Sequence, residues 1–461
     1  MLRNGRPGFS LWRAFVAAAL AAMIAVPAFA LDLKETLERG LQKSDRVMAA
    51  KADWDKAKMD RAASITNFLP QAEVQVEKLW LDVHNTFPTM NIVIPPGMSP
   101  EIIALLKSFD FSSFTAVPAY NNDLTVSAYQ PLTQLPSIGY YDKMAREGKE
   151  LARLGYEVTE DQVTLFLGRA YFGVLMAGKR AGALSQGLDT VQHLAKDAQN
   201  MMDQGMITKA DLLKFQMRQG DIEIQLMQAK SDEAQAKSYL AKLLEMPEDQ
   251  MICKDVNVTI EPAQNLESYL SQGESGRREL RMATLQEKIA QAASSASYLS
   301  LFPSVGAIAS ADWNDDGLDT TPDRTYSAGF MLTWNFWSWG GDWMKAKSAA
   351  YSRDKAVHEA KATKIDVRMS IESAWREALI AHQQVTVSKT ILEQAQENFR
   401  IDENRYKVGK TTATDLLGSQ TQLISAQTGY DGAVYGAAMA DASLEAAVGK
   451  KPYGQLTGGV Q

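Results

Sequence analysis

The sequence contains two copies of one unit, related by a fixed offset of 204 residues. The stretch MDQGMITKADLLKFQ (202–216) lines up with YKVGKTTATDLLGSQ (406–420), with six identities. A second offset of 233 residues relates Pro70 to Pro303, so the first copy holds 29 extra residues between that proline and its glycine motif. A repeat this long means that both copies adopt one supersecondary structure. The predicted divisions are a first copy at 31–245, an inter-repeat segment at 246–278, a second copy at 279–449 and a tail at 450–461.

Each copy has the same order of predicted elements. A helical segment ends at a proline, two alternating stretches follow, and a long helical segment then reaches the glycine motif and returns as a helix. The long segments cover 140–204 and 343–408, which are 65 and 66 residues without a proline. Each would extend roughly 100 Å as a straight helix. Their apolar residues recur every three or four positions, which predicts coiled-coil packing.

The glycine motif of the second copy, VGKTT (408–412), matches the end of the phosphate-binding loop G-x-x-x-x-G-K-[ST]. That loop would need a glycine at position 404, where the chain has Asn404. It would also have to follow a buried strand. The preceding residues, QENFRIDENRYK, are polar and helix-forming. The sequence therefore does not predict an ATPase site here.

Both glycine motifs are instead typical of a turn between two antiparallel helices. Each contains a glycine suited to the C′ position after a helix, where a left-handed backbone is common. Each then has a threonine suited to the N-cap of the returning helix and an acid in its first turn, where the helix dipole favours negative charge. In chain order these residues are Gly205, Thr208 and Asp211, and then Gly409, Thr412 and Asp415.

Four stretches alternate between apolar and polar residues, which predicts β-strands at 70–83, 120–132, 303–313 and 325–337. In the first, the alternation changes phase at Glu77 and Lys78, which indicates a bulge or a membrane boundary. A soluble sandwich with one wet face would alternate in the same way. The Ser-, Thr-, Gln- and Glu-rich polar sides instead favour an outer-membrane barrel. Tryptophans near the strand ends would lie at the membrane interface: Trp313, Trp334, Trp337, Trp339 and Trp343.

Four strands cannot close a barrel, because the smallest transmembrane barrels have eight. The long helices likewise offer more amphipathic surface than one globular core needs. A homo-oligomer in which every copy contributes four strands would meet both demands. The sequence therefore predicts a membrane protein with separate helical and sheet regions and at least one identical partner chain.

The N-terminus resembles a secretory signal peptide. Three arginines (Arg3, Arg6 and Arg13) precede an apolar run at 14–26, and Ala28-Phe29-Ala30 provides a cleavage pattern, so residues 1–30 are expected to be removed. The apolar run is too short to cross a bilayer. The formal net charge of −7 and the lack of a basic cluster argue against nucleic acid as a partner.

Catalytic and metal-binding patterns are not found in the sequence. Cys253 is the single cysteine, and the four histidines lack ligand spacing (His84, His193, His358 and His382), so no cofactor or metal is expected. The chain contains no G-x-S-x-G or H-E-x-x-H motif, and we do not expect an enzyme. A periplasmic coiled-coil scaffold or adaptor without a barrel is the alternative, although the strands and the tryptophan cluster argue against it.

The sequence resembles the TolC-like outer-membrane efflux channel family across its mature length. The opening segment LDLKETLERGLQKSDRVMAAKADWDKAKMDRAASITNFLP (31–70) is similar to the family's first helix running to a proline. The stretch LTWNFWSWGGDWMKAKSAA (332–350) is similar to its strand, glycine turn and alanine-rich helix. The stretch RYKVGKTTATDLLGSQTQL (405–423) and the ending Ala447-Val448-Gly449 complete the resemblance. The order, duplication and spacing of these motifs carry it, rather than any single motif.

The resemblance implies an α+β membrane protein. Each subunit would provide four transmembrane strands and long coiled-coil helices, and a homotrimer would complete a twelve-stranded β-barrel and a twelve-helix tunnel. It implies a passive channel in the outer membrane of a Gram-negative bacterium, embedded in outer-membrane lipid, with helices projecting into the periplasm. Its partners would be a periplasmic adaptor and an inner-membrane pump of a tripartite efflux or type I secretion system. The cargo is left open, because drugs, metals, siderophores and proteins pass through channels of this shape.

The resemblance also assigns roles to the glycine motifs. The tips Gly205-Met206-Ile207-Thr208 and Gly409-Lys410-Thr411-Thr412 would dock the adaptor at the periplasmic entrance. Asp211 and Asp415 would ring that entrance in a trimer and favour cations, and Tyr406 would help to hold it closed. Thr411 stands where the family has a basic residue and Gly418 where it has a second acid, so how this entrance is held closed is left open.

The segment 84–119 contains most of the extra residues of the first copy and corresponds to an extracellular loop. Its apolar residues predict one short amphipathic helix: Ile102, Ile103, Leu105, Leu106 and Phe109. The segment would either cover the barrel mouth or pack against its symmetry mates, and the sequence does not decide between these two roles.

Overall fold

The computed structural model describes residues 30–80, 97–108, 120–248, 251–258, 265–315 and 324–457. The predicted signal peptide lies outside these residues except for Ala30, as do 81–83 of the first predicted strand, His84 and Phe109. The chain divides into two compact units. The first comprises Met1–Asp55, Leu151–Thr284 and Glu359–Gln461, and the second Lys56–Glu150 and Leu285–His358. Helices α3, α5, α8 and α9 contribute residues to both units.

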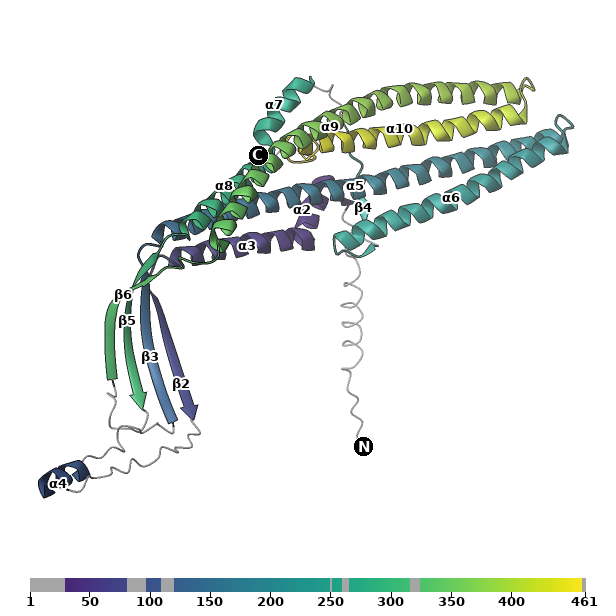
Figure 1. Ribbon diagram of the computed structural model, residues 1–461. Coiled ribbons are helices and arrows are strands. Elements are labelled where there is room, and N and C mark those ends of the chain that lie inside the picture. The colour runs from purple at the N-terminus through teal and green to yellow at the C-terminus, as the bar shows by residue number, and fades with distance from the viewer. Residues whose placement is uncertain are drawn as a thin grey trace, which may run out of the picture. The chain divides into compact units, whose positions relative to one another are not determined.

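Two helical hairpins dominate the first unit. Helix α5 (Leu135–Asp203) pairs with α6 (Lys209–Leu243), and α9 (Gly341–Lys407) pairs with α10 (Ala413–Ala447), as Figure 1 shows. Pro136 and the glycines at 340 and 341 fall at the starts of the two long helices, where they cost little. The predicted long helices are therefore present and begin a few residues earlier than their apolar pattern suggested.

Shorter helices precede each hairpin. Helices α2 (Leu33–Lys43) and α3 (Asp45–Thr66) precede the first, and α7 (Leu266–Gly276) and α8 (Arg278–Leu299) precede the second. The expected single opening helix is therefore interrupted, since the backbone of Ser44 is extended (ψ 114°). Arg277 is extended in the same way (ψ 121°) between α7 and α8. The two-residue strands β1 (Ala30–Leu31) and β4 (Ile252–Cys253) pair in parallel.

The helix bounds follow the sequence repeat. Helices α6 and α10 differ by 204 residues at both ends, and α2 and α7, like α3 and α8, differ by 233. Helix α7 is thus the counterpart of α2, and we place the start of the second copy at Leu266 instead of at 279. The signal for α7 was weak, because only Leu33/Leu266, Leu37/Leu270 and Gly40/Gly273 match along its eleven residues.

The first unit contains two main apolar clusters, and the spacing of their residues explains the hairpins. Near the hairpin turns, Leu184, Val191 and Leu194 of α5 pack with Phe215 and Ile222 of α6. At the other end of the hairpins, the second cluster contains four aromatic side chains among buried aliphatic ones: Tyr171, Phe172, Tyr435 and Tyr453. In the cluster near the turns, spacings of seven and three residues place the side chains on one face of each helix.

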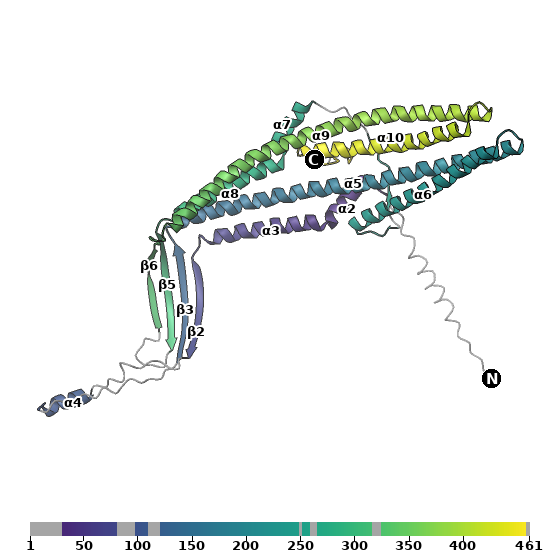
Figure 2. The ribbon, with the colours of Figure 1, turned by 45° about the vertical axis from the view of Figure 1, so that its right-hand side comes forward.

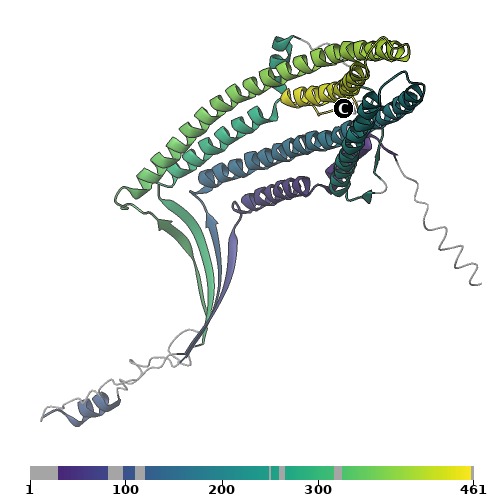
Figure 3. The ribbon, with the colours of Figure 1, turned by 90° about the vertical axis from the view of Figure 1, so that its right-hand side faces the viewer.

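The second unit contains an antiparallel sheet in the order β2–β3–β5–β6 (Figure 3). The strands are β2 (Gln71–Trp80), β3 (Tyr120–Pro131), β5 (Ser304–Asp315) and β6 (Arg324–Thr333). Their register places the predicted apolar residues on one face, as in the row Val74, Val126, Ala311 and Tyr326. The opposite face is polar, and hydroxyl and carboxylate groups bond across its strands, as from Thr125 to Asp312 (2.8 Å) and between Ser310 and Ser327 (2.9 Å).

The structure removes one of the two interpretations of the phase change in the first strand and shortens the fourth strand; a membrane boundary at Glu77 and Lys78 stays a prediction. No bulge interrupts β2, whose pairing with β3 runs without a break from Gln71↔Tyr129 to Trp80↔Tyr120. The change of phase is a change of side-chain type on a regular strand. The fourth strand ends at Thr333, not at 337. Its partner β5 begins at Ser304, directly after Pro303, which has no N–H to donate, and the chain turns at Trp339 and Gly340 with positive φ. The predicted loop helix is present as α4 (Pro100–Ser108).

Candidate functional site

The two hairpin turns, seen at the ends of α5–α6 and α9–α10 in Figure 2, have the same backbone geometry. Gly205 (φ +75°) and Gly409 (φ +69°) adopt the left-handed conformation predicted for them. The N–H groups of Gly205 and Met206 donate to the carbonyls of Met202 and Met201, both at 2.8 Å. The second turn repeats this pattern at Gly409 and Lys410. These are the paired bonds of a Schellman motif, which a glycine at C′ favours.

A capping box follows each glycine. Thr208 accepts a hydrogen bond from the N–H of Asp211 (3.2 Å), and the Asp211 carboxylate accepts from the Thr208 N–H (3.4 Å). Thr412 and Asp415 make the same pair of bonds at 3.2 and 3.3 Å. The threonine hydroxyls also donate to these carboxylates and lower the pKa of each. Both predicted N-caps are confirmed, and both acids have a structural role in addition to the role proposed for them at an entrance.

Tyr406 lies in the last turn of α9, where its ring is buried against Phe215 of α6 with ring centroids 5.5 Å apart. Burial, together with the charge of Asp211, raises the pKa of its hydroxyl. That hydroxyl has no hydrogen-bond partner among the described residues. Tyr406 therefore joins the second hairpin to the first beside Asp211. Sequence reasoning missed Phe215, although Leu212 and Phe215 begin the buried face of α6.

The remaining tip residues differ in exposure. Met206 is 61% exposed, whereas Ile207 packs against the apolar cluster near the turns. In the second turn, the Thr411 hydroxyl donates to Asp415 at 3.3 Å. A threonine in the place of the expected basic residue thus contributes a neutral bond to the acid of its own hairpin. The first tip therefore presents the apolar Met206 after its glycine, whereas the second presents the exposed Lys410 and threonine hydroxyls.

The predicted interface tryptophans separate into two groups along the sheet. Trp334, Trp337, Trp339 and Trp343 are exposed and follow the end of β6, whereas Trp313 lies near the other end of the sheet, opposite Arg324. Trp313 meets the edge of Tyr326 with centroids 6.4 Å apart. Sequence reasoning missed Trp80, which the regular register of β2 places on the same face as Trp313. The sequence could have indicated this, because Trp80 is an even number of residues from Val74 and Val76 and so lies on the same face of a regular strand.

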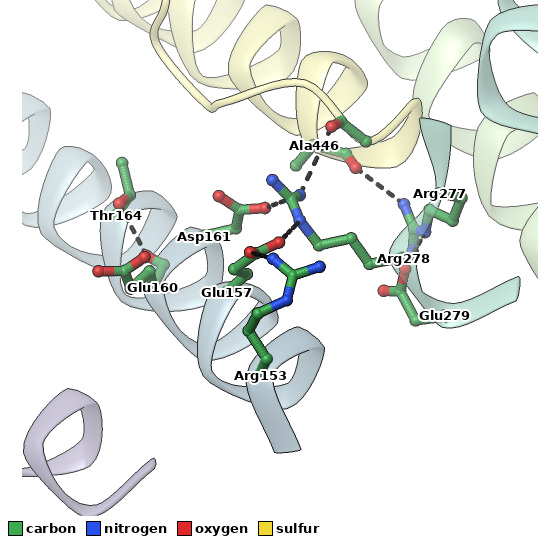
Figure 4. A network of polar contacts seen from close by, with 10 residues as sticks. Arg153, Glu157, Glu160, Asp161, Thr164, Arg277, Arg278, Glu279 and Ala446 are labelled. Carbon is green, nitrogen blue, oxygen red and sulfur yellow. Dashed lines mark hydrogen bonds and ion pairs between the residues drawn. The ribbon is translucent and has the colours of Figure 1, made fainter. Parts of the chain in front are cut away.

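A polar network joins the two copies at the start of α8 (Figure 4). The Arg278 guanidinium meets Glu157 at 2.9 Å and Asp161 at 2.6 Å, both on α5, and Arg153 also pairs with Glu157. Arg277 donates to the carbonyl of Ala446 at the end of α10 (2.9 Å). Burial raises the pKa of Asp161 to about 6, although Arg278 acts in the opposite direction. Basic groups at this helix end also complement its dipole.

No group of three or more His, Cys, Asp or Glu side chains could hold a metal ion within the described part of the chain. His382 has a different partner and lies 2.8 Å from Asp441 of α10. In the same residues, no helix is both long and apolar enough to cross a membrane.

Comparisons with known proteins agree with this geometry. No curated protein sequence matches the chain. Solved structures match its fold: outer membrane protein VceC of Vibrio cholerae has 15% identity and a TM-score of 0.74, covering 91% of this chain and 96% of its own. The outer membrane channel CmeC of Campylobacter jejuni has 14% identity and a TM-score of 0.72, covering 90% and 85%. For the open-state channel MtrE of Neisseria gonorrhoeae these values are 15%, 0.69, 91% and 89%.

A family model adds sequence evidence to the shared fold. Residues 269–450 match the model described as outer membrane efflux protein. This region contains all but the first three residues of α7, helices α8 to α10, strands β5 and β6, and the second hairpin turn. The matched sequence and the fold shared over nine tenths of the chain thus confirm the predicted resemblance. The chain therefore resembles the outer membrane efflux protein family in sequence over residues 269–450 and shares the fold of the solved outer-membrane channels.

Proposed function

We propose that the protein is the passive outer-membrane channel of a tripartite efflux or type I secretion system, and that it works as a homotrimer. The edges of the sheet support this proposal most directly. β2 and β6 are the outer strands, and within the described residues each has a neighbour on one side alone. Three antiparallel pairings separate them, so they run in opposite directions. β6 of one copy could therefore bond to β2 of the next, which would remove both open edges.

The two faces of the sheet agree with a barrel in lipid. On the apolar face, Val76 is 75% and Phe330 is 78% exposed, which is costly in water and favourable against lipid. Glu73, Ser127 and Ser310 line the other face, which would border an aqueous lumen. Three copies, the number that the resemblance implies, would supply twelve strands. The aromatic residues at both ends of the sheet then correspond to the two interfaces of a membrane.

The hairpin turns are the proposed entrance and docking site for a periplasmic adaptor. Met206 and Lys410 follow the two glycines, and the exposed Met206 offers an apolar contact. Asp211, Asp415 and Tyr406 are the proposed gate residues behind them. The pump that binds the adaptor would define the cargo and supply the energy.

The test places a photo-crosslinking amino acid at Met206 or at Lys410 in living cells, with Ser352, near the start of α9, as the control position. We expect adducts between the tip positions and an adaptor-type protein, and none from the control. The channel should also stay with outer membranes after a urea wash. Release by urea would support the scaffold alternative and contradict the channel.

A further inference from the structure

The two copies meet within the chain along α5 and α10. Gly187 of α5 receives the side chain of Ile424, and a Cβ added at Gly187 would lie 2.4 Å from the Cδ1 atom of Ile424. The buried Gln420 donates to the Gly187 carbonyl at 3.2 Å. Further along, Phe172 and Tyr435 pack with centroids 5.7 Å apart. One face of α5 in the first copy is therefore covered by α10 of the second.

The matching face of α9 is uncovered. The offset of 204 residues relates Met176, Ala183 and Gly187 of α5 to Ile380, Val387 and Ile391 of α9. These three α9 side chains are 50–57% exposed. Helix α9 thus presents a branched apolar residue, Ile391, at the position where Gly187 of α5 contacts α10, and two more on the same face, and exposing these side chains to water is unfavourable.

Helix α6 has an uncovered glycine that could receive such a side chain. The same offset relates Gln420 and Ile424 of α10 to Gln216 and Gly220 of α6. Gln216 is exposed, although its counterpart is buried, and a Cβ added at Gly220 would meet no atom within 4 Å. Exposed apolar residues flank this glycine on the same face of the helix: Leu213, Met217, Ile224 and Met227. The helix that carries the glycine and the helix that carries the isoleucine are thus exchanged between the two pairs. Within the chain a glycine of α5 receives an isoleucine of α10, and Ile391 of α9 would need a glycine such as Gly220.

One ion pair between helices also has a counterpart with the opposite charges. Arg278, the first residue of α8, pairs with Glu157 of α5. By the two offsets, these residues correspond to Asp45, the first residue of α3, and Lys361 of α9. Both are exposed. The Arg278–Glu157 pair therefore corresponds to Asp45 and Lys361, which have the opposite charges. These two exposed side chains could pair with another copy of the chain.

We propose that α9 of one copy packs against α6 of the next copy as α5 packs against α10 within the chain, with Ile391 over Gly220 and Lys361 paired to Asp45. This rests on the proposed homo-oligomer and names the surfaces that build it. Such an interface joins two different faces and can close a ring. The exchange also directs the pairing, because Ile391 against an isoleucine such as Ile424 would place two large side chains where the observed contact holds one.

Disulfide formation tests the contact in a Cys253→Ser background, which removes the single natural cysteine. Gly220→Cys with Ile391→Cys should shift most of the chain to dimer and trimer positions on a non-reducing gel. Each single substitution should leave it at the monomer position. The matched control, Gly187→Cys with Ile424→Cys, should form a bond inside one chain and leave its size unchanged. Co-expressed subunits that carry one substitution each should link in pairs.

A charge exchange provides a second measurement that needs no cysteine. Asp45→Lys and Lys361→Glu should each lower the temperature at which the oligomer dissociates, and the two together should restore it. If the wild type is a trimer but the paired cysteines give only monomer and the exchange fails to restore stability, the proposed interface is wrong and the channel proposal stands. A wild type that is monomeric by native mass spectrometry would overturn the channel proposal itself. Crosslinks from these positions to another protein would assign the face to an adaptor and contradict the inference.

Discussion

Among single residues, Asp161 links the polar network to pH. Burial raises its pKa to about 6, compared with about 4 for an aspartate in an unfolded chain. The folded protein therefore binds this proton more tightly, and the resulting stability is present below about pH 4 and lost as pH rises through 6. Asp161→Asn, which imitates the neutral form, should remove this contribution, which is at most about 3 kcal/mol. The free energy of unfolding in urea, measured between pH 4 and 7, checks this.

The comparison has to be made as a difference between variants, because burial also raises the pKa values of Asp441 and Glu445. The control is Asp60→Asn, which removes an exposed carboxylate of α3 outside the polar network. An Asp161→Asn profile that runs parallel to that of the wild type would show that Asp161 is already ionised throughout this range. The salt bridge to Arg278 would then outweigh its burial.

At the scale of whole helices, Gly→Ala substitutions at a helix end and inside a helix should change the free energy of unfolding in opposite directions. Gly409 adopts φ +69°, which costs other residues about 1 kcal/mol or more, so Gly409→Ala should lower the free energy of unfolding by about that amount. Gly182 lies exposed inside α5 with no atom within 4 Å of an added Cβ. Gly182→Ala should raise the free energy of unfolding by up to about 1 kcal/mol. Denaturant midpoints check both, and equal signs would contradict the assignment of Gly409 as C′.

These helix ends could be predicted because their signals are local. Gly409, Thr412 and Asp415 lie within seven residues, and alternation likewise marks each strand within about ten. The end of β6 depends instead on Ser304 of the neighbouring strand, and the break at Ser44 accompanies a bond from Arg39 to the carbonyl of Leu244. Such partners are far apart in the sequence and carry no local pattern.

The candidate site likewise has parts that local sequence predicted and parts that depend on residues far apart in the chain. The turns and their caps were predicted, whereas the polar network was not, since Arg278 and Asp161 are 117 residues apart. Tyr406 was identified by resemblance alone, and its partner Phe215 became visible only in the packed hairpins. The duplicated sequence was the one long-range signal, because it relates α6 to α10 and α5 to α9 without any contact.

For the assembled molecule, the proposed entrance ring and the observed capping boxes assign two roles to the same acids. Asp211 and Asp415 hold the first turn of each return helix through backbone and hydroxyl bonds. Reversing their charge with lysine would remove the caps as well as the charge, so a changed pore would not separate the two roles. Asparagine removes the charge and keeps one acceptor oxygen, which can take the place of the Oδ2 atom that accepts the threonine bonds, while an NH2 group replaces the other oxygen.

If the proposed entrance ring is present, Asp211→Asn combined with Asp415→Asn should leave the proposed trimer intact and remove most of the cation preference expected of the reconstituted channel. The reversal potential in a KCl gradient across a planar bilayer measures that preference and should move towards zero. The matched control, Asp211→Glu with Asp415→Glu, retains the carboxylates and should retain the wild-type reversal potential. If the asparagine variant kept the wild-type value as an intact trimer, the two acids would serve the caps alone, and charge selection would have to occur elsewhere along the pore.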